Sequence, residues 1–540
     1  MWQQNYTPIA DSLGVSAFLA ALPIFVLLFL LGVMRKPAWI AGLSGLATAL
    51  VVAVGVYGMP VGIALGAVTN GAAFGLLPIG WIVYWAIVLY QITLRTGKFE
   101  VIKDSVGSLS ADRRLQALLI AFSFGAFVEG AAGFGTPVAV AAAMLAGLGF
   151  SPFYAAGICL LANTAPVAFG SIGIPVFTLA GITGLPLLDL SANVGRICAP
   201  ISLLVPAYLV YVMGGLKALK GVLPAAIICG GGFAFTQFYV SNYWGPQLTD
   251  ITSSLVAIVG LVVLFKIWKP SDTFELPGTA KGSMPKKHAI GEVLLAWSPY
   301  LLLVVMVFLW GQDAVKAELN KFTINIQWPG LHNLVERIPP VVNKPSPYPA
   351  VYSLNYLSAA GTACLISTLL AGLVLRIGFG EYIKILGIAF RQLFLSLVTI
   401  AAVLGLAFLM NYCGATVTLG LAFAATGVLF PFFSALLGWL GVFLTGSDTS
   451  ANALFGNLQV VTATKLGLNP MLMAASNSSG GVMGKMISLQ SIAVAAAATG
   501  MPSTDEAKLF RFTLKHSILL ASLIGVVVTI YAYVAPHLVK

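Results

Sequence analysis

Two glycine-rich stretches decide the fold: GAFVEGAAGFGTP at residues 125–137 and GVFLTGSDTSAN at residues 441–452. Both begin with the pattern G-x-F-x-x-G. Each is followed by a similar landmark, LGFSP ending at Pro152 and LGLNP ending at Pro470. Because these landmarks keep the same order at similar spacing, together they predict an internal repeat.

The composition is that of a protein whose main solvent is lipid. Of 540 residues, 59% are hydrophobic and only 8% are charged, whereas soluble domains carry about 25% charged residues. A helix of about 20 apolar residues crosses the hydrocarbon core of a bilayer. We therefore expect an all-α polytopic membrane protein. Its predicted transmembrane helices, about twelve, are residues 17–34, 38–57, 72–94, 153–181, 195–214, 222–240, 252–268, 292–311, 350–375, 384–410, 470–497 and 512–535.

The net charge of +11 permits two interpretations, an acidic partner such as nucleic acid or a bias within cytoplasmic loops. The basic residues lie in loops between apolar runs and form no patch interleaved with aromatic residues, so no nucleic-acid partner is expected. The first apolar run is preceded by Asp11 and by no Lys or Arg. This is unlike a signal peptide and predicts a retained helix.

The positive-inside rule yields one topology that satisfies all six clusters of basic residues. Two further apolar stretches, 116–148 and 434–466, are rich in Gly, Ser and Thr and are predicted to be re-entrant hairpins, the first from the cytoplasm and the second from outside. Both termini and the polar segment 312–348 then lie outside, and 269–291 is a cytoplasmic loop. The clusters are Arg35 and Lys36; Arg95 to Arg114; Lys217 and Lys220; Lys266 to Lys287; Arg376 and Lys384; and Lys508 to Lys515.

The segments that precede the two hairpins carry opposite signatures. Residues 95–114 are basic and polar, whereas residues 411–433 carry no charge. An inverted repeat requires this outcome, and such repeats hold substrate on discontinuous helices near the bilayer midplane. We therefore divide the chain into an N-terminal repeat (1–240), a linker helix with a cytoplasmic loop (241–291) and a C-terminal inverted repeat (292–540).

Polar residues interrupt two apolar runs, at Asn163 and at Asn477. A helix broken there frees backbone N–H groups at the start of its second half, and these attract a carboxylate. The alternative is interhelical hydrogen bonding, worth about 0.6 kcal/mol on average. The expected substrate-binding residues are Asn163, Thr164, Asn477, Ser478, Ser479, Thr136, Ser447 and Lys485.

Glu129 and Asp448 lie in the expected hairpin tips. An ionised carboxylate at membrane depth is costly unless it is solvated or paired, so each is a candidate proton carrier. The alternative is a permanent ion pair with a buried base. Lys485 lies within an apolar run and would pair with Asp448 or with a substrate carboxylate. Arg196 fits a surface position as well as a site, and Gln490 is a weaker candidate.

Enzyme chemistry, metals and cofactors are not expected. No nucleophile–base pair is visible, and the four histidines lie in loops or near span ends without metal-ligand spacing. The five cysteines are scattered through apolar runs, which predicts neither a metal site nor a disulfide framework. No large soluble domain is present to bind ATP, so we expect an ion gradient to drive any transport. The cysteines are Cys159, Cys198, Cys229, Cys364 and Cys413.

Three motifs and the opening MWQQNYTP resemble the lactate permease family of bacterial proton symporters, over essentially the whole chain. The motifs are GAFVEGAAGFGTPVAVAAA, LLANTAPVAFGSIGIP and SNSSGGVMGKMISLQSIAVA. The resemblance implies uptake of L-lactate, and of D-lactate and glycolate, with protons across the inner membrane.

The hairpins are also similar to those of the wider ion-transporter superfamily, in which paired Asn-Thr motifs hold a substrate carboxylate and sodium. Carried over, this implies a carboxylate clamp of Asn163 and Thr164 with Asn477 and Ser478. The second motif reads Asn-Ser-Ser here, which fits protons better than sodium.

The resulting hypothesis is electroneutral symport of one small 2-hydroxy monocarboxylate with one proton. The hairpin core would rock against the remaining helices to alternate access. The nearest alternative is a sodium-coupled carboxylate carrier of the same fold, and a gated channel or an intramembrane enzyme are more distant ones. Lactate or glycolate preference and oligomeric state do not follow from the sequence.

Overall fold

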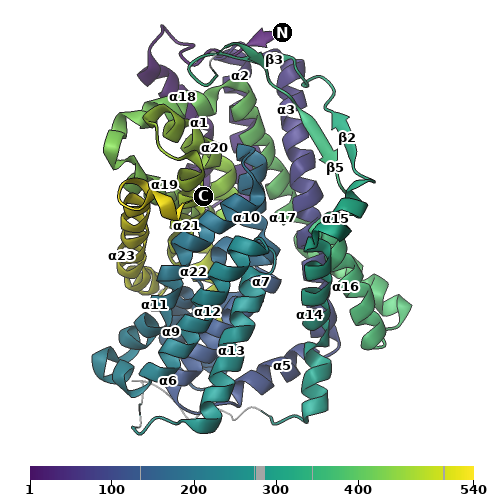
Figure 1. Cartoon of the computed structure of the whole chain (residues 1–540), viewed down its shortest axis with the longest axis vertical. Helices are drawn as coiled ribbons and strands as arrows, with labels where there is room; N and C mark the ends of the chain where they lie inside the picture. The colour runs from purple at the N-terminus through teal and green to yellow at the C-terminus, as the bar shows by residue number, and fades with distance from the viewer. Residues whose placement is uncertain (134, 273, 275–285, 343, 503–504, 540) are drawn as a thin grey trace.

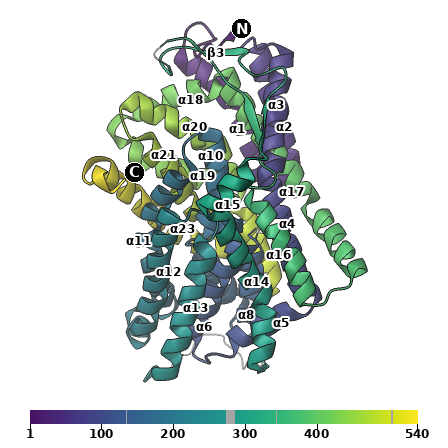
Figure 2. The same ribbon diagram turned by 45° about the vertical axis from the view of Figure 1, so that its right-hand side comes forward.

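Helices dominate the computed structural model (Figures 1 and 2). Within the described residues, eleven helices are long and apolar enough to cross a membrane, or up to thirteen if each of two bent pairs is one span. The expected all-α polytopic architecture is therefore confirmed. The structure describes residues 1–133, 135–272, 274, 286–342, 344–502 and 505–539.

The first half of the chain contains thirteen α-helices, one π-helix within the long third helix, a second within the first hairpin arm and one short 3₁₀ turn in the described residues. They are α1 (Leu13–Gly32), α2 (Ala38–Gly55), α3 (Val61–Phe74), η1 (Gly75–Gly80), α4 (Trp81–Arg95), α5 (Lys98–Gly107), α6 (Arg113–Gln116), η2 (Ala117–Phe124), α7 (Gly125–Ala131), α8 (Thr136–Gly147), α9 (Pro152–Ala162), η3 (Val167–Phe169), α10 (Gly170–Thr183), α11 (Leu187–Gly221), α12 (Leu223–Tyr243) and α13 (Thr249–Ile267).

The second half begins with a helix and a short stranded region and then returns to helices. Its helices are α14 (Ile290–Gly311), α15 (Asp313–Asn320), α16 (Ala360–Val374), α17 (Phe379–Cys413), α18 (Ala415–Phe423), η4 (Ala424–Leu429), α19 (Phe430–Thr445), α20 (Asp448–Leu466), α21 (Pro470–Gly484), η5 (Lys485–Ile487), α22 (Leu489–Thr499), α23 (Glu506–Tyr533) and η7 (Pro536–Leu538).

Both expected hairpins fold as two helices joined by a tight turn. In the first, α6, η2 and α7 form one arm and α8 the other; in the second, the arms are α19 and α20. Gly135, with φ of 81°, precedes α8, and Gly446, with φ of 70°, ends α19. Residues that carry a Cβ are strained at such positive φ angles. The glycines therefore allow each chain to reverse within a few residues.

The order of elements from α3 to α11 repeats from α17 to α23: a long helix, a short helix, a hairpin, a broken helix and a long helix. The two short helices, α5 and α18, lie at opposite ends of the molecule, as both views show (Figures 1 and 2). An inverted pair of repeats places its equivalent elements in this way. The domain boundaries at 240 and 291 themselves stay a prediction.

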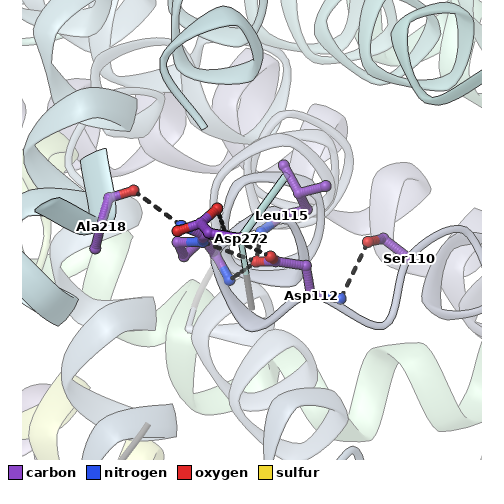
Figure 3. Close-up of polar contacts among 6 residues, drawn as sticks. Ser110, Asp112, Leu115, Ala218 and Asp272 are labelled. Atoms are coloured by element: carbon purple, nitrogen blue, oxygen red, sulfur yellow. Dashed lines mark hydrogen bonds and ion pairs between the residues drawn. The ribbon is translucent and has the colours of Figure 1, made fainter. Parts of the chain in front are cut away.

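The base of the first hairpin is anchored by a buried arginine. Arg114 is fully buried and pairs with Asp112 at 2.7 Å and with Asp272 at 2.8 Å. One of its guanidinium nitrogens also donates to the carbonyl oxygen of Ala218 at 3.3 Å. Figure 3 shows Asp112, Asp272 and Ala218 around this guanidinium group. The hydrogen bond from Arg114 holds the pKa of Asp272 below its usual value. This links the hairpin to α11 and to the chain after α13.

The predicted span at 350–375 is wrong in its first part. Residues Val351–Leu354 form strand β5, which pairs antiparallel with β2 (Ile324–Gln327), and α16 begins only at Ala360. The VYSL segment alternates in burial, as a half-buried strand does. The rest of the stranded region comprises β1 (Trp2–Gln3), β3 (Val335–Arg337) and β4 (Ser346–Pro347).

The first residues of the chain join the polar segment that was expected outside. Strand β1 pairs in parallel with β3, Trp2 opposite Val335. This places the N-terminal residues beside β3 at one end of the molecule, whereas α15, in the same polar segment, lies nearer its middle (Figure 1). Residues 273 and 275–285 of the expected loop 269–291 lie outside the described residues.

The helices pack as two groups. In one, α1, α2, α3, α4, α14, α16 and α17 contact one another; the other holds both hairpins, the broken helices, α11 to α13 and α23. All five cysteines are buried and unbonded to one another. The candidate site lies where the hairpin group faces α1, α2 and α17.

Candidate functional site

The tips of the two hairpins and the two broken helices enclose a cavity of about 130 Å³. We call it the central cavity. Its far wall comes from α1, α2 and α17, through Leu27, Leu31, Ala38, Ser396, Thr399, Ile400 and Val403. Its near wall is formed by Glu129, Gly135, Val167, Gly170, Ser171, Ile174, Pro175, Thr445, Gly446, Ser447, Asp448, Thr449, Ser450, Lys485, Gln490, Ser491 and Val494. The cavity therefore lies between the two groups of helices.

Four helices begin at this cavity. Gly135 precedes α8, and Ser447 caps α20 by accepting a hydrogen bond from the Ser450 N–H. Ser488 caps α22 in the same way through the Ser491 N–H. The fourth helix, α10, is regular only after the three residues from Ser171, whose φ angles are positive. Because helix N-termini present unpaired N–H groups and a partial positive charge, their convergence favours an anion.

Lys485 adds a full positive charge to the same wall. Its side chain is 8% exposed, and its Nζ donates a hydrogen bond of 2.7 Å to the carbonyl oxygen of Gly446. It therefore holds the turn of the second hairpin. It acts electrostatically on both Glu129 and Asp448, yet in the described part of the chain it forms no ion pair within 4.0 Å. The expected direct pair with Asp448 is absent from this structure, within the described residues.

Asp448 is held by two side chains of the second repeat. Its Oδ2 accepts hydrogen bonds from Ser478 Oγ at 2.6 Å and from Asn452 Nδ2 at 3.4 Å. Its Oδ1 has no hydrogen-bond partner among the described residues. Asp448 is thus fixed in orientation by one oxygen, and the other is available to a proton or a ligand.

Glu129 lies at the end of the first hairpin arm and is 4% exposed. Its Oε2 has no hydrogen-bond partner in the part of the chain that the structure describes. Asn163 lies beside the Glu129 carboxylate without completing a hydrogen bond to it, and neither polar atom of the Asn163 side chain has another described partner. These two residues face each other as an unsatisfied polar pair.

The predicted interruption at Asn477 is wrong. Helix α21 runs unbroken through it, and the bend of 43° comes later, between Pro470–Ile487 and Leu489–Thr499. Asn477 instead donates to Asn452 Oδ1 at 2.9 Å and accepts from Gln459 Nε2 at 3.0 Å. Since its amide is saturated by neighbouring helices, it serves the alternative role of interhelical hydrogen bonding.

The first interruption is where the sequence predicts it. Helix α9 ends at Ala162, Asn163 follows, and the next helical segment departs at 64°. The Thr164 hydroxyl, however, donates to the carbonyl oxygen of Leu161 at 2.8 Å. Its proton is therefore already used in a local hydrogen bond.

Of the eight expected substrate-binding residues, the central cavity is lined by Ser447 and Lys485. Both expected proton carriers, Glu129 and Asp448, line it as well. Arg196 lies elsewhere: its guanidinium donates to Asn242 Oδ1 at 2.8 Å and to the Leu538 carbonyl at 2.7 Å. The expected residues outside the cavity lining are Asn163, Thr164, Asn477, Ser478, Ser479 and Thr136.

Several residues were missed by the sequence analysis. Ser171 lines the cavity from the broken helix α10, and Ser491 and Thr449 lie in the first turns of two of the helices that begin there. Asp250, 1% exposed at the start of α13, lies behind Glu129. The sequence signal that could have identified Ser171 is a hydroxyl residue next to a glycine-rich helix break. For Asp250 the sequence offers only an acidic residue beside a predicted span.

Comparison with known proteins gives close relatives over the full length. The chain is 45% identical to the glycolate permease GlcA of Escherichia coli K12, covering 99% of this chain and 98% of that protein. It is 46% identical to an L-lactate permease of Bacillus subtilis 168, covering 97% of each, and 44% identical to the L-lactate permease of Escherichia coli K12, covering 99% and 98%.

A family model described as L-lactate permease matches residues 16–535, which is almost the whole chain. The relatives are permeases and not enzymes. Together with the many apolar helices, this makes the protein a multi-pass membrane transporter. The chain belongs to the L-lactate permease family.

Proposed function

We propose that the protein imports L-lactate, and also D-lactate and glycolate, by symport with protons across the bacterial inner membrane. The observation that carries the proposal is the convergence of four helix N-termini and the Lys485 ammonium on the central cavity of about 130 Å³. Pockets for drug-sized ligands measure about 300–1,000 Å³, so this cavity suits a small anion. The relatives named as lactate and glycolate permeases match that ligand class.

The substrate carboxylate accepts hydrogen bonds from the first N–H groups of α20 and lies near the Lys485 charge. The hydroxyls of Ser171, Ser447 and Ser491 line the same cavity and are placed to orient the 2-hydroxyl group. Such buried polar groups would be left unpaired by an analogue without that hydroxyl, which disfavours it. The site therefore selects small 2-hydroxy monocarboxylates.

Proton coupling follows from the charges around the cavity. Glu129 and Asp448 both line it, and an incoming carboxylate adds a third negative charge beside a single lysine. Buried charges that are not compensated are expensive. Protonation of one of the two carboxylates compensates the anion, which makes the loaded transporter electrically neutral and couples uptake to the proton gradient.

Access to the site is proposed from the end that carries Arg35 and Lys36, which the positive-inside rule predicts to be cytoplasmic. A second cavity, of about 740 Å³, is lined by these two residues and by Arg511. It shares Leu31, Ala38, Thr445, Gly446 and Gln490 with the central cavity. Rocking of the hairpin group against α1, α2 and α17 would close this route and open the opposite one.

The test is counterflow of labelled L-lactate in liposomes that contain the purified protein. With an inward proton gradient and no sodium, we expect concentrative uptake, which a protonophore abolishes. Uptake that needs sodium and ignores the pH gradient would favour the sodium-coupled carrier of the same fold and reject proton symport. Flux that neither saturates nor exchanges would indicate a gated channel.

A further inference from the structure

Asp250 lies directly behind the tip of the first hairpin. A Cβ placed on Gly130, the neighbour of Glu129, would lie 2.8 Å from the Asp250 Cβ and 3.1 Å from the Ile251 nitrogen. Helices α7 and α13 are therefore in backbone contact at this point. Asp250 is 1% exposed and does not line the central cavity. It therefore packs against the residue that follows Glu129, outside the lining of the cavity.

The Asp250 carboxyl group has no local structural role that explains its burial. Neither of its oxygens has a hydrogen-bond partner among the residues that the structure describes, although an acid in a first helical turn commonly accepts from free N–H groups. Buried polar groups are almost always paired, and buried carboxylates are paired or lose their charge. Asp250 therefore requires a proton or a change in its surroundings.

The titratable groups that face this pair are few. Glu129 on α7 acts electrostatically on Asp250, and Asp250 in turn acts on Cys198 of α11. Lys485 on η5 acts electrostatically on Glu129, and Glu129 acts on Asp448 of α20. Arg114, at the base of the first hairpin, is already paired with Asp112 and Asp272, so among the described residues around the hairpin tips three buried carboxyl groups share the single cation of Lys485. With all three ionised the core would carry two uncompensated negative charges, so it must hold protons even before an anion arrives.

We propose that Asp250 is a second proton-binding residue of transport, forming with Glu129 a carboxyl pair that holds the coupling proton. This rests on the proposed proton symport. In the transfer step, the O–H bond of the Glu129 carboxyl breaks and a new O–H bond forms on the Asp250 carboxylate, leaving Glu129 ionised. The reverse step reprotonates Glu129 when the substrate anion enters. Two adjacent carboxyl groups titrate as a pair, so Asp250 sets the pH range of transport.

The test compares Asp250→Asn with the unmodified full-length protein in liposomes. Loss of one member of a coupled pair is expected to shift the pH midpoint of lactate uptake by about one unit or more. Accumulation driven by a pH gradient falls more than counterflow at fixed pH, because counterflow needs no net proton release. Proton uptake on adding L-lactate to detergent-solubilised protein, followed with a pH-sensitive dye, should fall as well.

Ser254→Ala on the same helix is the matched control and should keep the pH profile of the unmodified protein, since the Ser254 hydroxyl donates, within the described residues, to the Ile251 carbonyl of its own helix. An Asp250→Asn variant with an unchanged midpoint and unchanged proton uptake would overturn the inference and leave proton symport intact. Failure of the unmodified protein to respond to protons would instead reject the proposed function. If Asp250→Asn does not fold, Asp250→Ser also removes the carboxyl group, and an unshifted midpoint there counts against the pair.

Discussion

The Lys485 ammonium lies between the turn of the second hairpin and the two carboxyl groups of the central cavity. It joins the turn of the second hairpin to the central cavity, because its Nζ donates to the Gly446 carbonyl and the residue lines the cavity. Its position within an apolar run was enough to predict a functional role from the sequence. Its partner was not predictable, since Gly446 lies 39 residues away and only the tertiary fold brings them together.

Lys485→Met is expected to weaken L-lactate binding about tenfold or more, because hydrogen bonds to charged groups contribute about 1.5–3 kcal/mol. Isothermal titration of the purified protein measures this directly. The matched control is Lys508→Met, whose side chain is 72% exposed and pairs with Asp505 at the surface. Equal affinity in both variants would remove Lys485 from the site.

Asn163 and Asn477 now separate into two roles. Asn477→Ala removes the partner of Asn452 and Gln459 and should lower the free energy of unfolding by about 1–3 kcal/mol. Asn163→Ala removes an amide without a described hydrogen-bond partner and should leave thermal stability nearly unchanged while altering lactate uptake through Glu129. Thermal unfolding and uptake of both variants test this. A stable Asn477→Ala variant that cannot bind lactate would restore the predicted clamp.

At the scale of elements, glycines and polar residues coincide with the hairpin tips, and this made both hairpins predictable. The break in the second repeat was misplaced because Asn477, Ser478 and Ser479 resemble a helix interruption, whereas the side chains of Asn477 and Ser478 bond to a neighbouring helix and α21 continues. The short strands were missed since each has two to four residues and depends on pairing with a distant segment.

One link between elements responds to pH. The Nε2 atom of His288 forms a hydrogen bond of 2.9 Å with Asp104 Oδ2 on α5. Its Nδ1 atom forms one of 3.0 Å with Glu292 Oε2 on α14. The hydrogen bonds to Asp104 and then Glu292 raise the pKa of His288 above its usual value. The link should therefore be fully present below about pH 6.5, the ordinary histidine pKa. It should be lost as the pH rises through the raised pKa.

Hydrogen exchange of α5 measured across this pH range checks the expectation, with faster exchange predicted at the alkaline end. His288→Asn should remove the pH dependence of the exchange rate in α5. A variant that keeps the same profile would assign the effect to other groups.

At the scale of the whole molecule, the distribution of basic residues was enough to predict that α5 and α18 lie at opposite ends. No pattern of residues in the sequence predicts that Asp250 lies near Glu129, because this proximity arises where two apolar helices cross at Gly130. The sequence thus predicts topology better than it predicts the composition of the site.

Impermeant maleimide should label Val428→Cys in intact cells and Glu100→Cys only after permeabilisation. Both positions are exposed; Glu100 lies on α5 and Val428 just after α18, and these two helices lie at opposite ends of the fold. The native cysteines are buried and serve as the unlabelled background. Labelling of both positions from one side would contradict the inverted arrangement and, with it, the midplane site.

The shared wall between the two neighbouring cavities has a use in ligand design. A lactate-like head group seated at Ser447 and Lys485 would have Thr445, Gly446 and Gln490 on its flank, and beyond them the larger space lined by Arg35, Lys36 and Arg511. A molecule with a second acidic group on a short tether could occupy both spaces at once. Such a two-headed inhibitor would wedge the hairpin group apart from its support and trap the transporter in one orientation.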